Sequence, residues 1–320
     1  MPGSYAHITL SNVASEKRRL KKIKDFPREA IDAAGLFTNF LELGSISPDY
    51  PYLDVLSGDS KEWANSMHYT HTCQDIYAAA ELVRKIPVGH VRQKCLAWLM
   101  GYTSHVVADM CIHPVIELKV GPYKGNETPH RTCEMHQDTY IFERLGVGVP
   151  SASGHMKATI MTCHGQNDKN KLDPDVKQLW FETLNKVYKD EFETNPPDLD
   201  VWHKRCYMIL EKLLPTSSNL VGFSRHIVNN FGFSYPAPSE VNQSFIEELS
   251  VPFPIAGKSK LHYDQIFDYA IEKVQLVWLD VCRHALGLGD FITFADQEWN
   301  LDTGKNILAQ DQIPIFWEIA

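Results

Sequence analysis

The sequence lacks the short motifs that mark several large classes of enzyme. No GxSxG, HExxH, P-loop or GxGxxG pattern occurs in its 320 residues. These absences argue against a serine hydrolase with a nucleophile elbow, a zincin protease, a P-loop NTPase and a Rossmann dinucleotide-binding protein. Any catalytic function must therefore rest on another arrangement of residues.

The cysteines give no sign of a disulfide framework or of a thiolate metal site. There are seven of them, an odd number, and they are scattered without a CxxC pair. Disulfide-rich domains and thiolate zinc sites carry paired, regularly spaced cysteines. Reduced thiols are therefore expected.

The sequence also lacks a recognisable export signal or membrane-spanning segment. Its start, MPGSYAHITL, has no basic region, no apolar core and no small-residue cleavage site, which predicts a cytoplasmic protein. The longest apolar stretch, residues 95–116, is interrupted by His105, Asp109 and His113. A spanning helix rarely carries such side chains, so this stretch predicts a buried helix.

The chain has fewer basic than acidic residues. The chain has 40 acidic and 31 basic residues and a net charge of −9, so no nucleic-acid partner is expected, because phosphate binding depends on basic patches. The basic run 17–24 is expected to be a solvated helix face, with peripheral contact to an anionic lipid surface left open. The length fits one large domain, and we expect a single domain over residues 1–320.

Apolar residues recur at helical spacing through most of the chain, and strand-like alternation is scarce. This pattern predicts an all-α protein with one multi-helix domain and a helical C-terminal extension. Gly44 is expected to end the first of these helices, and Pro129 to open the fourth. The expected helices cover residues 28–43, 70–86, 89–119, 128–145, 174–192, 197–214 and 260–286.

Eight residues of the kind that bind metals occur in the first half of the chain. They are His7, Asp49, His68, His105, Asp109, His113, His130 and Glu134. Residues four apart share a face of an α-helix, so two groups of them can converge, one from residues 105–113 and one from residues 130–134. One such histidine alone would more often be an ordinary core or surface residue. The eight together predict a zinc site, because imidazole and carboxylate are zinc ligands.

Two nearby residues fall outside this set. His136 lies six residues after His130, away from its helical face, and is expected to be structural. Asp138, eight residues after His130, could instead orient a ligand through a hydrogen bond.

The ligand series and its surroundings resemble the zinc-dependent phospholipase C family, whose fold is shared with fungal single-strand zinc nucleases. The resemblance is strongest over residues 1–145. A single HxxxD pair is weak evidence, but the whole ordered series rarely arises by chance. The resembling stretches are AHI around His7, SPDY at 47–50, MHYTH at 67–71, GYTSHVVADMCIHP at 101–114 and HRTCEMHQD at 130–138.

The resemblance implies two or three zinc ions and a role for each ligand. It assigns Asp49, His68, His105 and Asp109 to a first zinc, His7, Asp109 and the chain's N-terminal amine to a second, and His113, His130 and Glu134 to a third. Asp49 is also the candidate that accepts a proton from the attacking water. Secreted relatives supply the amine from an N-terminal tryptophan, whereas here removal of Met1 would leave Pro2 in that place.

The predicted function is therefore a zinc-dependent, phospholipase C-like hydrolase of a phosphate ester, either a small molecule or a lipid. Close metal ions can activate water and stabilise the charge of a reacting phosphate. One alternative is a nuclease or nucleotide phosphatase of the same fold. Another, from a different class, is a non-catalytic binding or scaffold protein stabilised by metal.

Overall fold

The computed structural model describes residues 3–54, 57–150, 154–213, 235–289, 292–309 and 314–317. Within these residues it contains thirteen α-helices and three two-stranded antiparallel sheets. The prediction of an all-α protein is confirmed. The sheets pair β1 (His164–Gly165) with β2 (Asp168–Leu172), β3 (Leu249–Ile255) with β4 (Lys258–Leu261), and β5 (Trp299–Asn300) with β6 (Lys305–Asn306).

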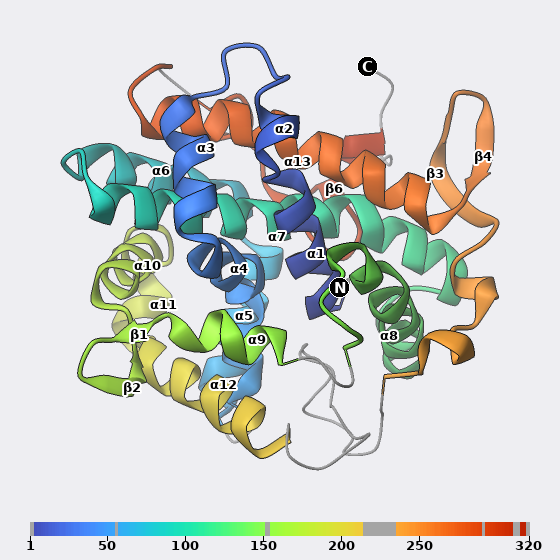
Figure 1. Ribbon diagram of the computed structural model, residues 1–320, viewed down its shortest axis with the longest axis horizontal. Helices are drawn as coiled ribbons and strands as arrows, with labels where there is room; N and C mark the ends of the chain where they lie inside the picture. The colour runs from blue at the N-terminus through green and yellow to red at the C-terminus, as the bar shows by residue number, and fades with distance from the viewer. Residues whose placement is uncertain are drawn as a thin grey trace.

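Helix α7 (His90–Val120) forms the centre of the protein and crosses the middle of Figure 1. Every side chain from Cys95 to Ile116 is buried. By length and composition α7 could cross a membrane, but its apolar window lies entirely inside the protein. The prediction that residues 95–116 form a buried helix is therefore confirmed.

The other helices pack around α7. Helix α13 (Tyr263–Ala285) lies along it, and α4 (Thr38–Ile46), α3 (Arg28–Leu36) and α6 (Thr72–Lys85) also contact it (Figure 1). The remaining helices are α1 (Ser4–Ala14), α2 (Lys17–Leu20), α5 (Gly58–Tyr69), α8 (Glu127–Phe142), α9 (His155–Ala158), α10 (Pro174–Val187), α11 (Lys189–Thr194) and α12 (Leu199–Leu213). A 3₁₀ helix, η1 (Ser47–Leu53), follows α4 directly.

Two predicted helices are each divided in two. The expected helix 28–43 breaks at Phe37, which leaves the helical region, and continues as α4 through Gly44 to Ile46. The expected helix 174–192 breaks at Tyr188 between α10 and α11. The Tyr188 hydroxyl lies within hydrogen-bonding distance of the Ser66 carbonyl, the Thr70 carbonyl and the Asp75 carboxylate. These three hydrogen bonds fix Tyr188 at the break.

The sequence predicted that Gly44 would end a helix, and this prediction is wrong, because α4 continues through Gly44 to Ile46. Gly44 instead allows α4 and α7 to touch. A Cβ atom on Gly44 would lie 2.1 Å from the Trp98 carbonyl oxygen. A Cβ atom on Gly101 of α7 would lie 2.0 Å from the Leu41 carbonyl oxygen. Only glycine permits such a close backbone approach. This contact sets the position of the residues that follow Gly44, which lead into η1.

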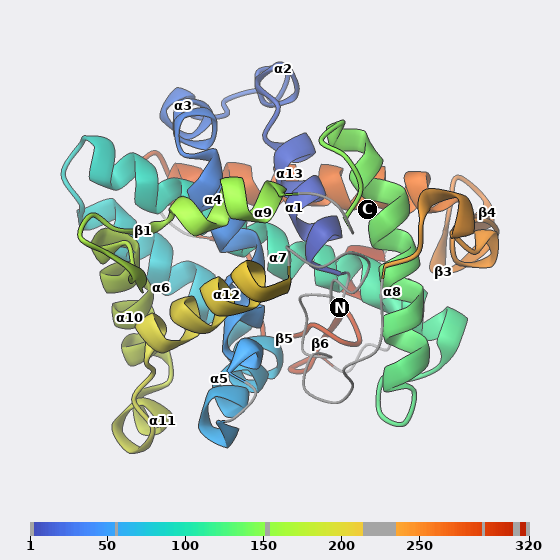
Figure 2. The ribbon, with the colours of Figure 1, turned by 60° about the horizontal axis from the view of Figure 1, so that its bottom comes forward.

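The C-terminal segment returns to the middle of the molecule. Figure 2 shows the β5–β6 hairpin beside α5 and beneath α7. The Leu301 amide donates a hydrogen bond to the His68 carbonyl (3.1 Å), and the Thr72 hydroxyl donates to the Trp299 carbonyl (2.9 Å). The hairpin is therefore attached to the junction between α5 and α6.

Candidate metal centre

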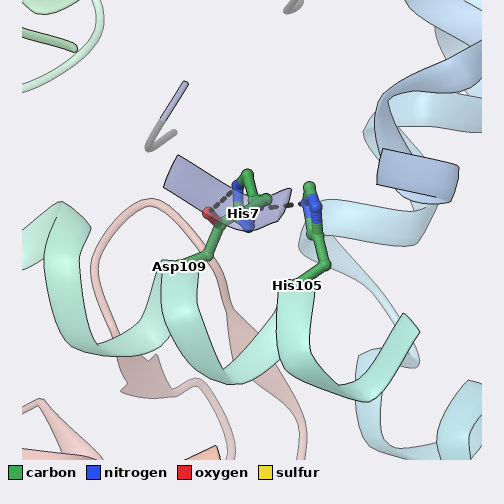
Figure 3. Close-up of side chains that lie close together, drawn as sticks. All are labelled: His7, His105 and Asp109. Carbon is green, nitrogen blue, oxygen red and sulfur yellow. Dashed lines mark ion pairs between the residues drawn. The ribbon is translucent and has the colours of Figure 1, made fainter. Parts of the chain in front are cut away.

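Five of the eight predicted ligands come together at one buried site. His7 comes from α1, Asp49 from η1, His68 from the last turn of α5, and His105 with Asp109 from one face of α7. None of the five side chains is more than 1% exposed. Figure 3 shows His7 facing the two residues of α7. Four separate segments thus deliver imidazole and carboxylate groups to one point.

The spacing of the ligand atoms is that of groups arranged around a metal. The His7 Nε2 atom lies 3.3 Å from Asp109 Oδ1, and His105 Nε2 lies 3.4 Å from Asp109 Oδ2. His68 Nε2 lies 3.5 Å from Asp49 Oδ1 and 3.4 Å from His105 Nε2. Zinc bonds of about 2.0–2.1 Å place tetrahedral ligand atoms about 3.3–3.4 Å apart. The donor set therefore fits zinc.

Several of these atoms are buried without a hydrogen bond from any described residue. They are both oxygens of Asp49, both oxygens of Asp109 and both ring nitrogens of His7. Buried carboxylates are strongly destabilising unless a cation or hydrogen-bond donors compensate them. A bound cation would satisfy this requirement for both aspartates.

Hydrogen bonds behind the site orient two of the histidines. The Nδ1 atom of His68 lies 2.6 Å from the Ala64 carbonyl oxygen, and Nδ1 of His105 lies 2.9 Å from the Ser45 carbonyl oxygen. A proton on each Nδ1 leaves Nε2 free to bind metal. Both Nε2 atoms point into the cluster. Ser45 follows Gly44, so the close contact of α4 with α7 also positions the partner of His105.

The pKa values of His7, His105 and Asp109 depend on one another. Burial, followed by the proximity of His105, lowers the pKa of His7; the two rings are stacked with centroids 4.0 Å apart. Burial alone would lower the pKa of His105, but the Asp109 carboxylate outweighs it and raises that pKa overall. Burial likewise opposes ionisation of Asp109, yet His105 and His7 hold its pKa below the ordinary value. Asp109 is thus an anion in contact with two imidazoles.

Two groups of three ligand atoms could each hold an ion, and they share His105. One consists of Asp49, His68 and His105, and the other of His7, His105 and Asp109. These groups overlap with the first and second zinc sets that the resemblance implied, but those sets share Asp109, whereas the two groups share His105. The expected amine ligand at Met1 or Pro2 lies outside the described residues.

The third implied set is only partly assembled. His113 and His130 are fully buried, with ring centroids 6.5 Å apart. The His130 Nδ1 atom lies 3.9 Å from Glu134 Oε1, and its Nε2 atom lies 2.7 Å from the Gly121 carbonyl oxygen. In the described part of the chain these three residues do not offer ligand atoms within 4.8 Å of one another. His113 Nδ1 instead lies 3.3 Å from Asp302 Oδ1.

Asp138 acts on the site through the N-terminus of α1. It accepts hydrogen bonds from the amides of Ala6 (2.8 Å) and Tyr5 (3.3 Å) and from the Tyr235 hydroxyl (2.9 Å). Burial raises the pKa of its carboxyl group to about 7, although these donors favour the anion. The sequence offered Asp138 as a residue that could orient a ligand. Its hydrogen bonds instead cap α1, the helix that carries His7.

We expect Asp138→Ala to lower the free energy of unfolding by about 1–3 kcal/mol, because the Tyr5 amide and the Tyr235 hydroxyl lose their buried acceptor. It should also weaken metal binding by loosening His7. Thermal unfolding and metal analysis measure both effects. Glu143→Ala, which removes an exposed acid just after α8, is the control and should change neither. Unaltered metal content in Asp138→Ala would show that the cap does not position His7.

The fold and site define an all-α protein with a buried histidine–carboxylate cluster that could hold metal. A family model of zinc-dependent phospholipase C matches residues 6–190. The match covers more than half of the chain, and the chain therefore belongs to this zinc-dependent family. All eight predicted ligands lie within the matched residues, whereas Asp302 lies outside them. No curated protein and no solved structure significantly matches the chain.

We expect protein purified without chelator to contain two or three zinc equivalents per chain. The reason is that the ligand atoms form two groups of three, and a single tetrahedral ion takes only four ligands. Elemental analysis against protein concentration measures the ratio. A value of one or less would contradict a multinuclear centre.

Proposed function

We propose that this protein hydrolyses the phosphate ester of a lipid, in the manner of a phospholipase C. The observation that supports this most is the buried cluster of His7, Asp49, His68, His105 and Asp109, whose atoms have the spacing of zinc ligands. Family membership supports the choice of substrate class. Zinc in this cluster would supply a Lewis acid and a bound water of lowered pKa.

In this proposal the residues of the chain bind, orient and move protons. Asp109 lies between His7 and His105 and would hold these two histidines around one ion. Asp49, beside His68, accepts the proton of the attacking water on a carboxylate oxygen. The water oxygen forms a bond to phosphorus, the bond from phosphorus to the lipid oxygen breaks, and that oxygen takes up a proton. The products are a lipid alcohol and a phosphorylated headgroup.

A cavity beside α7 has a size that suits part of such a substrate. It has a volume of about 400 Å³ and is lined by residues that include Pro114, Glu117, Leu118 and Lys305. Pro114 follows the predicted ligand His113 in the chain. Ligand pockets usually occupy about 300–1,000 Å³. The apolar part of the lining suits an acyl or glycerol portion, and Glu117 and Lys305 add charges of opposite sign.

Peripheral contact with a lipid surface and a cytoplasmic location are parts of the same proposal. The basic run that begins with α2 is largely exposed, and Lys21, Lys22 and Lys24 all lie on the surface. All seven cysteines are free and buried, which agrees with a reducing compartment. Binding to vesicles with and without anionic lipid, and imaging of the protein in cells, test these two points.

The function is tested by giving zinc-loaded protein four substrates in parallel: a phospholipid vesicle, a soluble phosphodiester, a phosphomonoester and single-stranded DNA. We expect phospholipid hydrolysis, with the products identified by phosphorus NMR, and its loss in Asp49→Asn. Asp59→Asn changes an exposed acid on α5 and should remain active. Cleavage of DNA alone would identify a nuclease. A zinc-loaded protein inactive in all four assays would contradict the proposal and favour a scaffold.

A further inference from the structure

Asp302 lies beside the metal centre, although it comes from the far end of the chain. It follows strand β5, outside the residues that match the family. Its Oδ1 atom lies 3.3 Å from Nδ1 of His113, and its Oδ2 atom accepts a hydrogen bond of 2.8 Å from the Tyr69 hydroxyl. Tyr69 directly follows the ligand His68. Asp302 therefore lies between the helices α5 and α7 that carry the centre.

His113 has the characteristics of a ligand facing this carboxylate. Its side chain is 0% exposed, and neither ring nitrogen forms a hydrogen bond with a described residue. A buried imidazole without a hydrogen bond is costly unless something else binds it. The side chain of Asp302 is 14% exposed, so the pair lies at the edge of the core, where an ion can enter.

The geometry distinguishes a ligand pair from an orienting hydrogen bond. The contacts that orient His68 and His105 end on backbone carbonyls at 2.6 and 2.9 Å. The contact of His113 with Asp302 is longer, at 3.3 Å, and lacks hydrogen-bond geometry. This separation equals that of His7 from Asp109 in the central cluster. Ligand atoms around one zinc ion have this spacing.

The hairpin that carries Asp302 is fixed on both sides. Leu301 is hydrogen-bonded to the His68 carbonyl, and Trp299 exchanges two hydrogen bonds with Thr72. On the other side Gly304 lies so close to α7 that a Cβ atom there would be 2.6 Å from Pro114. These contacts hold the carboxylate at a constant distance from His113, as a ligand requires.

The local charge also favours a cation. Glu117, one turn after His113 on α7, is half-buried, and both burial and the Asp302 carboxylate raise its pKa. The Asp302 carboxylate, 3.3 Å from the buried His113, thus has a second acidic residue in its surroundings. Lys305 partly offsets the negative charge at Glu117. A divalent ion between Asp302 and His113 would relieve the repulsion between the carboxylates.

We propose that Asp302 is a metal ligand and binds the same ion as His113. The C-terminal segment would then complete the metal centre. The proposal takes zinc from the proposed function, but it concerns binding and not hydrolysis. Asp302 lies outside residues 6–190, which match the family, so the C-terminal segment would supply a metal ligand that the matched residues do not contain. The third metal position would then combine α7 with the β5–β6 hairpin.

The test compares Asp302→Ala, His113→Ala and the double variant by elemental analysis and by equilibrium dialysis against zinc. We expect each single variant to lose the same one equivalent of zinc, and the double variant to lose no more. Asp296→Ala, which removes an exposed acid of the same segment, should keep the full content. Full zinc content with unchanged affinity in Asp302→Ala would overturn the proposal. A double variant that loses two equivalents would also overturn it, since the residues would serve different ions.

A second variant covers the case in which Asp302→Ala does not fold. Tyr69→Phe removes only the hydroxyl that donates to Asp302, and loss of a hydrogen bond to a ligand typically weakens metal affinity about 10–100-fold. We expect at least about a 10-fold loss at one position, together with an altered absorption spectrum of the cobalt-substituted protein. Unchanged affinity and spectrum would overturn the proposal. None of these measurements uses a substrate, so they stand apart from the outcome of the hydrolysis assays.

Discussion

Asp109→Asn is expected to remove at least one zinc equivalent and to lower the rate of hydrolysis by about 1,000-fold or more. Its two oxygens lie 3.3 Å from His7 Nε2 and 3.4 Å from His105 Nε2, and Oδ2 lies 4.0 Å from His68 Nε2. It thus contacts all three histidines of the cluster. Asparagine preserves the shape but removes the charge that offsets the metal, and the loss of one metal from such a centre removes several kcal/mol of transition-state stabilisation.

Metal analysis, circular dichroism and initial rates on the same preparation measure this effect. His136→Ala is the matched control: His136 is on the neighbouring helix α8, is only partly buried, and accepts a hydrogen bond from the Asn242 amide. It should retain its zinc and its rate. Equal losses in the two variants would show that the cluster is not where the metal binds.

Gly44→Ala is expected to destabilise the protein by about 3 kcal/mol or more, at the upper end of the range for overpacked cores. The added methyl group would lie 2.1 Å from the Trp98 carbonyl oxygen and 2.8 Å from the Tyr102 amide nitrogen. Both are backbone atoms of α7, which cannot rotate away as a side chain could. For a protein of this size the change corresponds to a fall in Tm of roughly 4–5 °C.

The same substitution should weaken metal binding, because α4 carries the Ser45 carbonyl that orients His105. Thermal unfolding of the metal-loaded and chelator-treated protein separates the two effects. Gly35→Ala on the exposed face of α3 is the control, since its new methyl group would meet no atom within 4 Å beyond its chain neighbours and its own helix backbone. It should be neutral or stabilising by about 0.5–1 kcal/mol. An unchanged Tm in Gly44→Ala would mean that α4 and α7 do not touch there.

Helical periodicity is enough to predict the central helix and part of the site. The boundaries expected for residues 89–119 agree with α7 to within a residue, because a long apolar pattern with few breaks has one stable conformation. The four-residue spacing also placed His105 and Asp109 together correctly, since their proximity depends only on the geometry of one helix. By contrast, α1 and α5, which carry His7 and His68, were not predicted. Helix α1 is buried on nearly all sides, so it lacks the polar face that reveals a surface helix.

The sequence by itself determined which residues could bind metal and that most of them lie on helices. Only the tertiary structure decided which residues meet. Each four-residue step turns the helix by about 40° beyond a full turn, so His113 lies about 80° away from His105 and faces a different partner. That partner, Asp302, lies 189 positions further along the chain. Likewise, glycine in a helical pattern can mark an end or a close contact, and only the packing of α7 against α4 showed that Gly44 is a contact. Such long-range contacts depend on the packing of whole elements, which no local pattern encodes.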